Sequence, residues 1–137
     1  MKRLINFLLI VILICFFYSC AEEEIYSTFE DGVYEGTFTM VESNNTIHTG
    51  KVTFSFIHNK YICIPESQFL PPSGGGNFQI SKNILTLEDK VAHTANFDWS
   101  LILNGKFNFT YDGKKLILKQ NDRINNRYRT IDLIKQE

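Results

Sequence analysis

The sequence predicts an all-β protein: an antiparallel meander that closes into a small barrel of eight or nine strands. Apolar runs recur at roughly 8–12-residue spacing, which is typical of barrels and sandwiches. Asn104-Gly105 and Asp112-Gly113 separate such runs, and dipeptides of this kind are strong hairpin signals. Tight turns keep successive strands adjacent, and closure removes the exposed edges of an aromatic-rich sheet, so both favour a barrel.

Residues 1–19 have the pattern of a signal peptide and are set apart from this domain. Lys2 and Arg3 precede an apolar run from Leu4 to Tyr18 that only Asn6 interrupts. A membrane-spanning helix needs about 20 apolar residues, so the run is better suited to a cleaved signal.

The residues around Cys20 indicate how the signal is cleaved. Phe17-Tyr18-Ser19-Cys20-Ala21 resembles the relaxed, aromatic-tolerant lipoprotein box of Bacteroidota-type lipoproteins. The resemblance implies that Cys20 becomes the N-terminus and carries the lipid, palmitate included, which makes the membrane a partner of this chain. A secreted protein cleaved without lipidation and an uncleaved anchor are the alternatives.

Residues 20–30 are expected to form an acidic tether. The cluster Glu22-Glu23-Glu24 resembles the export signal that carries such lipoproteins to the outer face of the outer membrane. An ordinary solvated charge run would leave the protein on the periplasmic face instead. Of 14 basic residues, the loss of Lys2 and Arg3 leaves 12 against 15 acidic, a net charge of −3, which argues against nucleic acid as a partner.

The barrel domain is expected to cover residues 31–137, beginning with three strands. A turn at 58–59 or 59–60 joins the second strand, 51–56, to the third, 61–64. Alternation leaves three isoleucines, Ile57, Ile62 and Ile64, on the outer face, where they need a cover. The same alternation predicts these inward residues: Tyr34, Phe38, Met40, Val52, Phe54, Phe56, Tyr61 and Cys63.

Residues 65–76 hold all three prolines and are expected to form a packed loop over one end of the barrel or over those isoleucines. A two-residue turn at Lys82-Asn83 then pairs Ile80 with Leu85 and Phe78 with Leu87.

The segment 99–119 is expected to contain three strands with a three-residue turn at 103–105 and a two-residue turn at 112–113. The last strand, 127–134, lacks a clean alternation, which suggests a bulge. These turns place seven apolar residues on one inner face: Phe97, Trp99, Leu101, Phe107, Phe109, Leu116 and Leu118.

The overall plan resembles the lipocalin-like small lipoproteins of the Bacteroidota type. The resemblance rests on Gly32-Val33-Tyr34-Glu35-Gly36, on the hairpin 76–87 and on the stretch from Phe97 to Leu118. It implies a lipocalin-like barrel. The chain departs from true lipocalins by having Gly-x-Tyr in place of Gly-x-Trp, and with Cys63 alone after Cys20 it has no internal disulfide. A lipocalin's ligand therefore does not transfer.

No group of residues has the spacing that catalysis or metal binding requires. His48, His58 and His93 fall in expected turns or links, and Gly74-Gly75-Gly76 lacks the lysine and helix of a phosphate loop. We therefore expect a nonenzymatic protein without a cofactor or metal.

Two functions stay open at this point. The barrel is either a binding module for a small apolar or amphipathic ligand or, with a filled core, a surface protein-interaction module such as an accessory subunit or an enzyme inhibitor. The candidate ligand-lining residues are Phe54, Phe56, Tyr61, Phe78, Trp99, Phe107 and Phe109.

Overall fold

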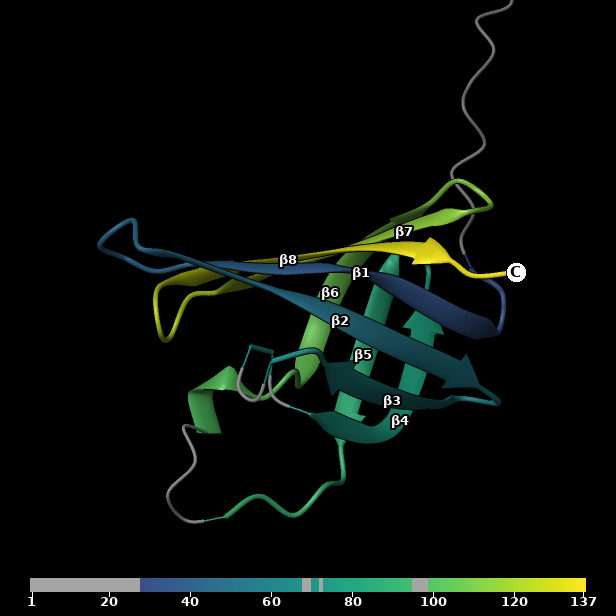
Figure 1. Ribbon diagram of the computed structural model, residues 1–137, viewed down its shortest axis with the longest axis horizontal. Coiled ribbons are helices and arrows are strands. Elements are labelled where there is room, and N and C mark those ends of the chain that lie inside the picture. The colour runs from purple at the N-terminus through teal and green to yellow at the C-terminus, as the bar shows by residue number, and fades with distance from the viewer. Residues whose placement is uncertain (1–27, 68–69, 72, 95–98) are drawn as a thin grey trace, which may run out of the picture.

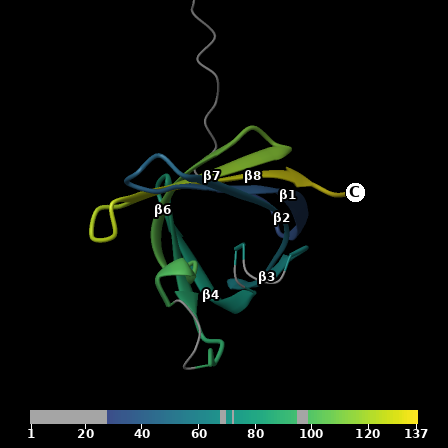
Figure 2. The ribbon, with the colours of Figure 1, turned by 60° about the vertical axis from the view of Figure 1, so that its left-hand side comes forward.

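The computed structural model describes residues 28–67, 70–71, 73–94 and 99–137. Eight antiparallel strands follow one another around a closed barrel, and β1 pairs with β8 to complete it (Figure 1 and Figure 2). The all-β antiparallel meander is confirmed, and it is consistent with a lipocalin-like fold. The elements are β1 (Gly32–Val41), β2 (Ile47–Ile57), β3 (Lys60–Pro65), β4 (Gly74–Ser81), β5 (Ile84–Asp89), the 3₁₀ turn η1 (Trp99–Leu101), β6 (Gly105–Tyr111), β7 (Lys115–Asp122) and β8 (Arg127–Lys135).

The two ends of the barrel differ. Tight turns join β2 to β3, β4 to β5 and β6 to β7 at one end, which we call the turn end. The connections β1–β2, β3–β4, β5–β6 and β7–β8, together with η1, lie at the other, which we call the loop end (left in Figure 1).

The predicted faces of the first five strands are confirmed. All eight inward residues predicted on β1, β2 and β3 are buried. The first of the two alternative turns is the one observed: His58 and Asn59 have φ of 49° and 63°, and Ile57 pairs with Lys60. The β4–β5 hairpin pairs Ile80 with Leu85 and Phe78 with Leu87, as predicted.

In the loop after β3, the described residues Leu70 and Pro71 lie at the loop end. Leu70 packs against the core, and its carbonyl oxygen lies 2.0 Å from where a Cβ on Gly50 would be, so only glycine fits on β2 at that point. Ile62 and Ile64 stay 54% and 59% exposed. The loop is expected to lie either over one end of the barrel or over the isoleucines. Its described residues lie over the end of the barrel. Residues 74–76, expected in the loop, belong to β4.

The tether assignment is wrong for Phe29. Its ring is buried at the turn end and lies 4.9 Å from that of Phe56 and 5.8 Å from that of Phe78, measured between centroids. The adjacent Glu30 forms an ion pair with Lys135 and accepts a 2.7 Å hydrogen bond on its carbonyl from the Tyr34 hydroxyl. The packed domain therefore begins before residue 31.

The strand expected around Trp99 is replaced by η1, and the turn expected at 103–105 does not form. Gly105 instead begins β6 and pairs with Leu87 of β5, while Phe107 pairs with Leu85. The physical reason is that β5, further back in the chain, offers β6 an apolar partner that residues 99–103 would otherwise have supplied. Phe97 lies outside the described residues.

The β6–β7 turn is centred one residue later than predicted, on Gly113 and Lys114. Tyr111 pairs with Leu116 and Phe109 with Leu118, a register shift of two residues that preserves the inward face. The cause is Asp112, whose carboxylate accepts hydrogen bonds from the backbone N–H of Lys114 (2.9 Å) and Lys115 (2.6 Å).

The bulge predicted in the last strand is absent. β8 pairs without interruption with both β1 and β7. Its inward residues are Arg129, Ile131 and Leu133, and Tyr128 points outward. The alternation escaped detection because one inward residue is an arginine.

Candidate functional site

Six of the seven candidate ligand-lining residues come together inside the barrel, and the seventh does not. Trp99 lies on η1 and is 59% exposed, so its predicted inward placement is wrong. The six buried residues are Phe54, Phe56, Tyr61, Phe78, Phe107 and Phe109.

Aromatic rings contact one another across the interior. Phe54 stacks on Phe56 at 5.4 Å between ring centroids, and Phe56 meets Phe78 edge to face at 5.3 Å. Phe29 adds a further ring that contacts Phe109 at 5.7 Å. These spacings fall within the roughly 4.5–7 Å of directly packed aromatic pairs, so these rings are in direct contact with one another.

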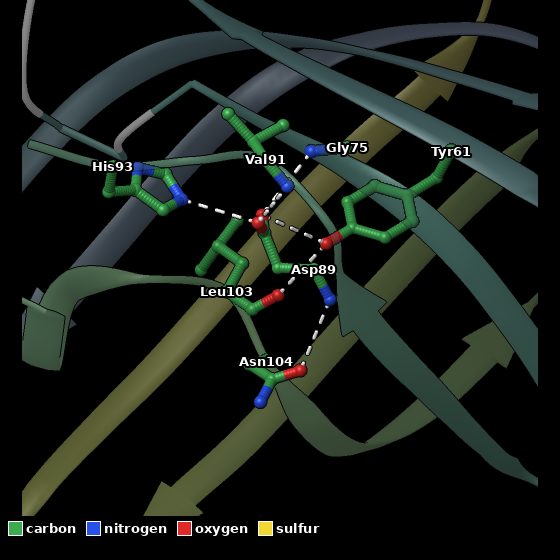
Figure 3. Close-up of polar contacts among 7 residues, drawn as sticks. All are labelled: Tyr61, Gly75, Asp89, Val91, His93, Leu103 and Asn104. Carbon is green, nitrogen blue, oxygen red and sulfur yellow. Dashed lines mark hydrogen bonds and ion pairs between the residues drawn. The ribbon is translucent and has the colours of Figure 1, made fainter.

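Titratable side chains gather instead at the loop end, where Asp89 organises a network (Figure 3). One carboxylate oxygen accepts hydrogen bonds from the Gly75 N–H (3.3 Å) and the Tyr61 hydroxyl (3.4 Å). The other accepts one from the Val91 N–H (2.8 Å) and lies 3.2 Å from His93 Nε2. The side chains of Asp89 and His93 are only 7% and 8% exposed, so the pair is screened from water.

The network also fixes the start of β6. The Tyr61 hydroxyl lies within 3.2 Å of the Leu103 carbonyl oxygen, and the Asp89 N–H donates to Asn104 Oδ1 at 3.2 Å. Burial, reinforced by the charge of Asp89, raises the pKa of Tyr61 and raises the pKa of Cys63 to about 12. Both groups are therefore protonated at neutral pH, which does not suit them to nucleophilic attack.

His93 extends the network to the surface. Its ring meets that of Trp99 edge to face, with centroids 5.9 Å apart. The exposed indole on η1 is thus braced by an imidazole that Asp89 holds from inside the barrel.

A second network surrounds Arg129 on β8. Its guanidinium donates to Gln120 Oε1 (2.6 Å) and to Asp122 Oδ2 (3.4 Å). Gln120 in turn donates to the Asn104 carbonyl (2.9 Å). Burial opposes ionisation of Asp122, but hydrogen bonds from Asn125 and the charge of Arg129 outweigh it and lower the pKa of Asp122.

A depression of about 510 Å³ lies between η1 and the β7–β8 connection, above this second network. Its rim includes Trp99 and Ile124, which is 95% exposed. Lys106, Arg123 and Arg129 also line it. Within the part of the chain that the structure describes, neither Lys106 nor Arg123 lies within 4.0 Å of a carboxylate.

The outer face of β2 and β3 carries the exposed isoleucines. Ile57 is 50% exposed, and a shallow depression of about 680 Å³ runs beside Ile64 over β1, β2 and β3. The prediction that Ile57, Ile62 and Ile64 share the outer face is confirmed.

The histidines do not form a common site. His48 lies 3.2 Å from Glu42, His58 occupies a turn at the opposite end, and His93 pairs with Asp89. Among the described residues, no three His, Cys, Asp or Glu side chains are close enough to hold a metal ion. None of the helices in those residues has the length and hydropathy to cross a membrane.

Sequence reasoning selected Trp99 for its aromatic character but missed Arg129, Lys106, Arg123 and Asp89. Arg129 had a signal, since it holds an inward position two residues before Ile131. The others are brought together by the fold from β5, β6 and the β7–β8 connection. No protein-family description, curated protein or solved structure matches this chain.

Proposed function

We propose that this chain is a nonenzymatic lipoprotein, anchored in the outer membrane through a lipid on Cys20, whose barrel works as a surface interaction module. An accessory subunit or an inhibitor of an enzyme is the role that this architecture suits. The observation that carries the proposal is the packed aromatic interior, in which Phe29, Phe56, Phe78 and Phe109 contact one another.

The same observation weighs against the alternative, an interior cup for a small apolar or amphipathic ligand. Small-ligand sites occupy roughly 300–1,000 Å³. Opening such a volume among Phe54, Phe56 and Tyr61 would separate rings that pack at 5.4 and 6.3 Å. Recognition at the surface needs no such rearrangement.

The exposed features supply contact surface. The loop end presents Trp99 and Ile124, and the β2–β3 face presents Ile62 and Ile64. Exposed apolar side chains that lie together, as Trp99 and Ile124 do around one depression, are typical of protein surfaces that bind a partner. A nonenzymatic role is supported by Cys63, whose raised pKa keeps the thiol protonated, and by Asp89, whose carboxylate is committed to structural hydrogen bonds.

The anchor is tested by metabolic labelling with an alkyne-modified palmitate in cells that make the wild-type chain or Cys20→Ala. We expect the wild type to label and to fractionate with the outer membrane, and the variant to do neither. Labelling of the variant, or its absence in the wild type, would refute the anchor. Protease shaving of intact cells then separates the cell surface from the periplasmic face.

The filled interior is tested by native mass spectrometry of the purified chain, followed by titration with a fluorescent fatty acid. We expect no co-purified ligand and no saturable binding. A bound apolar molecule that is lost in Phe54→Trp, which adds volume to the interior, would instead support the cup. Ile62→Trp on the outer face is the matched control.

A further inference from the structure

We infer that the depression between η1 and the β7–β8 connection is a binding site for an anionic saccharide. The inference rests on the proposed surface role, because it names the ligand class that one end of the module recognises. Three properties of the described residues support it: an aromatic platform, a fixed set of planar hydrogen-bonding groups and an excess of positive charge.

The platform is Trp99. Its indole is 59% exposed on the rim of the depression. Covering this apolar ring with a ligand would be favourable, because it would remove apolar surface from water. It does not hang freely, because the His93 ring packs against it and Asp89 holds His93. A sugar ring has an apolar C–H face that can stack on such a rigid indole.

The floor of the depression supplies polar groups that are already oriented. Arg129 is held by Gln120 and Asp122, and Gln120 is held by the Asn104 carbonyl. These groups bond to one another, and the Arg129 side chain is only 4% exposed, so they give the floor a fixed shape beneath the exposed groups that line the depression. Since these groups are locked before binding, little conformational entropy is lost when a ligand docks.

The charge of the depression selects an anion. Lys106, Arg123 and Arg129 face it, with Asp122 as the acidic residue in its lining. The three cations less one carboxylate give a local charge of +2, although the chain as a whole has a net charge of −1. A carboxylated or sulfated sugar would receive a charge-assisted bond from Lys106 or Arg123 while its ring stacks on Trp99.

The position of the depression favours a soluble saccharide over a lipid headgroup. The described chain enters the barrel at Phe29, which packs at the turn end. The depression is lined by residues of η1 and of the β7–β8 connection, which are at the loop end (left in Figure 1). A protein held by a lipid on Cys20 would therefore direct the depression away from its own membrane.

The test is calorimetric titration of the full chain in detergent with trigalacturonate, a hyaluronan tetrasaccharide and a heparin disaccharide. Trp99 is the only tryptophan of the sequence, so its fluorescence reports on the site directly. We expect at least one of these probes to bind saturably and to change that fluorescence. The fully methyl-esterified trigalacturonate, which keeps the rings and loses the charge, should bind at least tenfold more weakly than its acid.

Two variants locate the binding. Lys106→Gln combined with Arg123→Gln should weaken it at least tenfold, as should Trp99→Ala. Lys60→Gln combined with Lys114→Gln removes the same charge at the turn end and should leave affinity unchanged. Far-UV circular dichroism and urea unfolding show whether each variant is folded.

The inference is overturned if none of the three anionic saccharides binds, or if the Lys106/Arg123 double variant binds as the wild type does. It is also overturned if tetraglutamate or phosphatidylglycerol vesicles bind the same site as tightly as the saccharides do, because the site would then recognise negative charge without recognising a sugar. Saccharide binding retained in Cys20→Ala would show that the site works without the anchor. Saccharide binding by a wild-type chain that is never lipidated would refute the proposed localisation only.

Discussion

Arg129 is a charged side chain turned inward in a barrel whose other inward residues are mostly apolar. It is 3% exposed, and its guanidinium reaches Gln120 and Asp122 on the neighbouring strand β7. Removing an ion from water costs several kcal/mol, which such partners offset only when their geometry is good. Deleting one partner is therefore more damaging than the net contribution of the pair suggests, because it leaves the other buried and unpaired.

Replacing Arg129 with alanine should lower the free energy of unfolding by about 3 kcal/mol, in the range for breaking a buried charged pair. Urea denaturation measures this loss. Arg123→Ala, which removes an exposed cation nearby, is the control and should change stability by less than about 0.5 kcal/mol. A loss of under about 1 kcal/mol in Arg129→Ala would show that Gln120 and Asp122 need no internal donor.

The same arginine shapes the response to acid. The pKa of Asp122 is lower in the folded chain than in the unfolded chain. Its ionised form therefore stabilises the fold above the unfolded pKa, and this contribution is lost as the pH falls through the folded pKa. In Arg129→Ala the pKa of Asp122 should rise, which NMR titration of the carboxylate measures, and stability should depend less on pH in the acidic range. An unchanged pKa would remove Arg129 as a cause.

Cys63 should be nearly inert in the folded protein. Burial raises its pKa to about 12, so at pH 8 the thiolate fraction is lower by roughly three orders of magnitude than that of a free cysteine near pKa 8.5. We expect labelling by a thiol reagent to be slow in buffer and fast in urea, with Cys63→Ser identifying the signal that comes from this residue. Fast labelling under native conditions would mean that β3 opens readily.

At the scale of the element, strands whose two faces differ in polarity were predictable, and segments whose partners lie elsewhere in the chain were not. Val52, Phe54 and Phe56 alternate with polar residues, so β2 could be placed from local pattern alone. Trp99 and Leu101 have the same pattern, but β6 pairs with β5 and leaves them to form η1. The candidate site was beyond sequence reasoning for the same reason, since Trp99, Lys106 and Arg123 meet only after the barrel closes.

Phe29 shows that the packed domain extends into a segment that looks like a linker in the sequence. Because acidic residues precede it, the segment reads as a polar tether, yet its aromatic ring packs against Phe56, Phe78 and Phe109. Phe29→Ala should lower the free energy of unfolding by about 3 kcal/mol, typical of a buried phenylalanine. Urea unfolding measures it, with the exposed Ile124→Ala as control. A loss of less than about 1 kcal/mol would mean that the barrel does not depend on Phe29 to close its turn end.

At the scale of the whole molecule, the two ends of the barrel are not equivalent, because both termini of the barrel are at one end. Pairing of β1 with β8 brings Glu30 to Lys135, so the start and the finish of the barrel lie together at the turn end. The strand β1 has ten residues, which at about 3.3 Å each and a tilt near 40° places the loop end on the order of 25 Å from the turn end. Attachment through the N-terminal side therefore gives the two ends unequal access to the membrane.

This difference between the two ends predicts that fluorophores attached to them are quenched unequally by lipid in vesicles that carry the lipidated protein. Nine residues lead from Cys20 to Phe29, a reach of at most about 30 Å, and the point of attachment is at the turn end. A fluorophore on Asn83→Cys at the turn end should therefore be quenched by brominated lipid more strongly than one on Ser43→Cys at the loop end. Protein with Cys20→Ala, mixed with the same vesicles, should show little quenching at either site. Equal quenching at both labels would mean that the barrel lies on its side, and stronger quenching at Ser43→Cys would place the loop end, with Trp99 and Ile124, against the lipid.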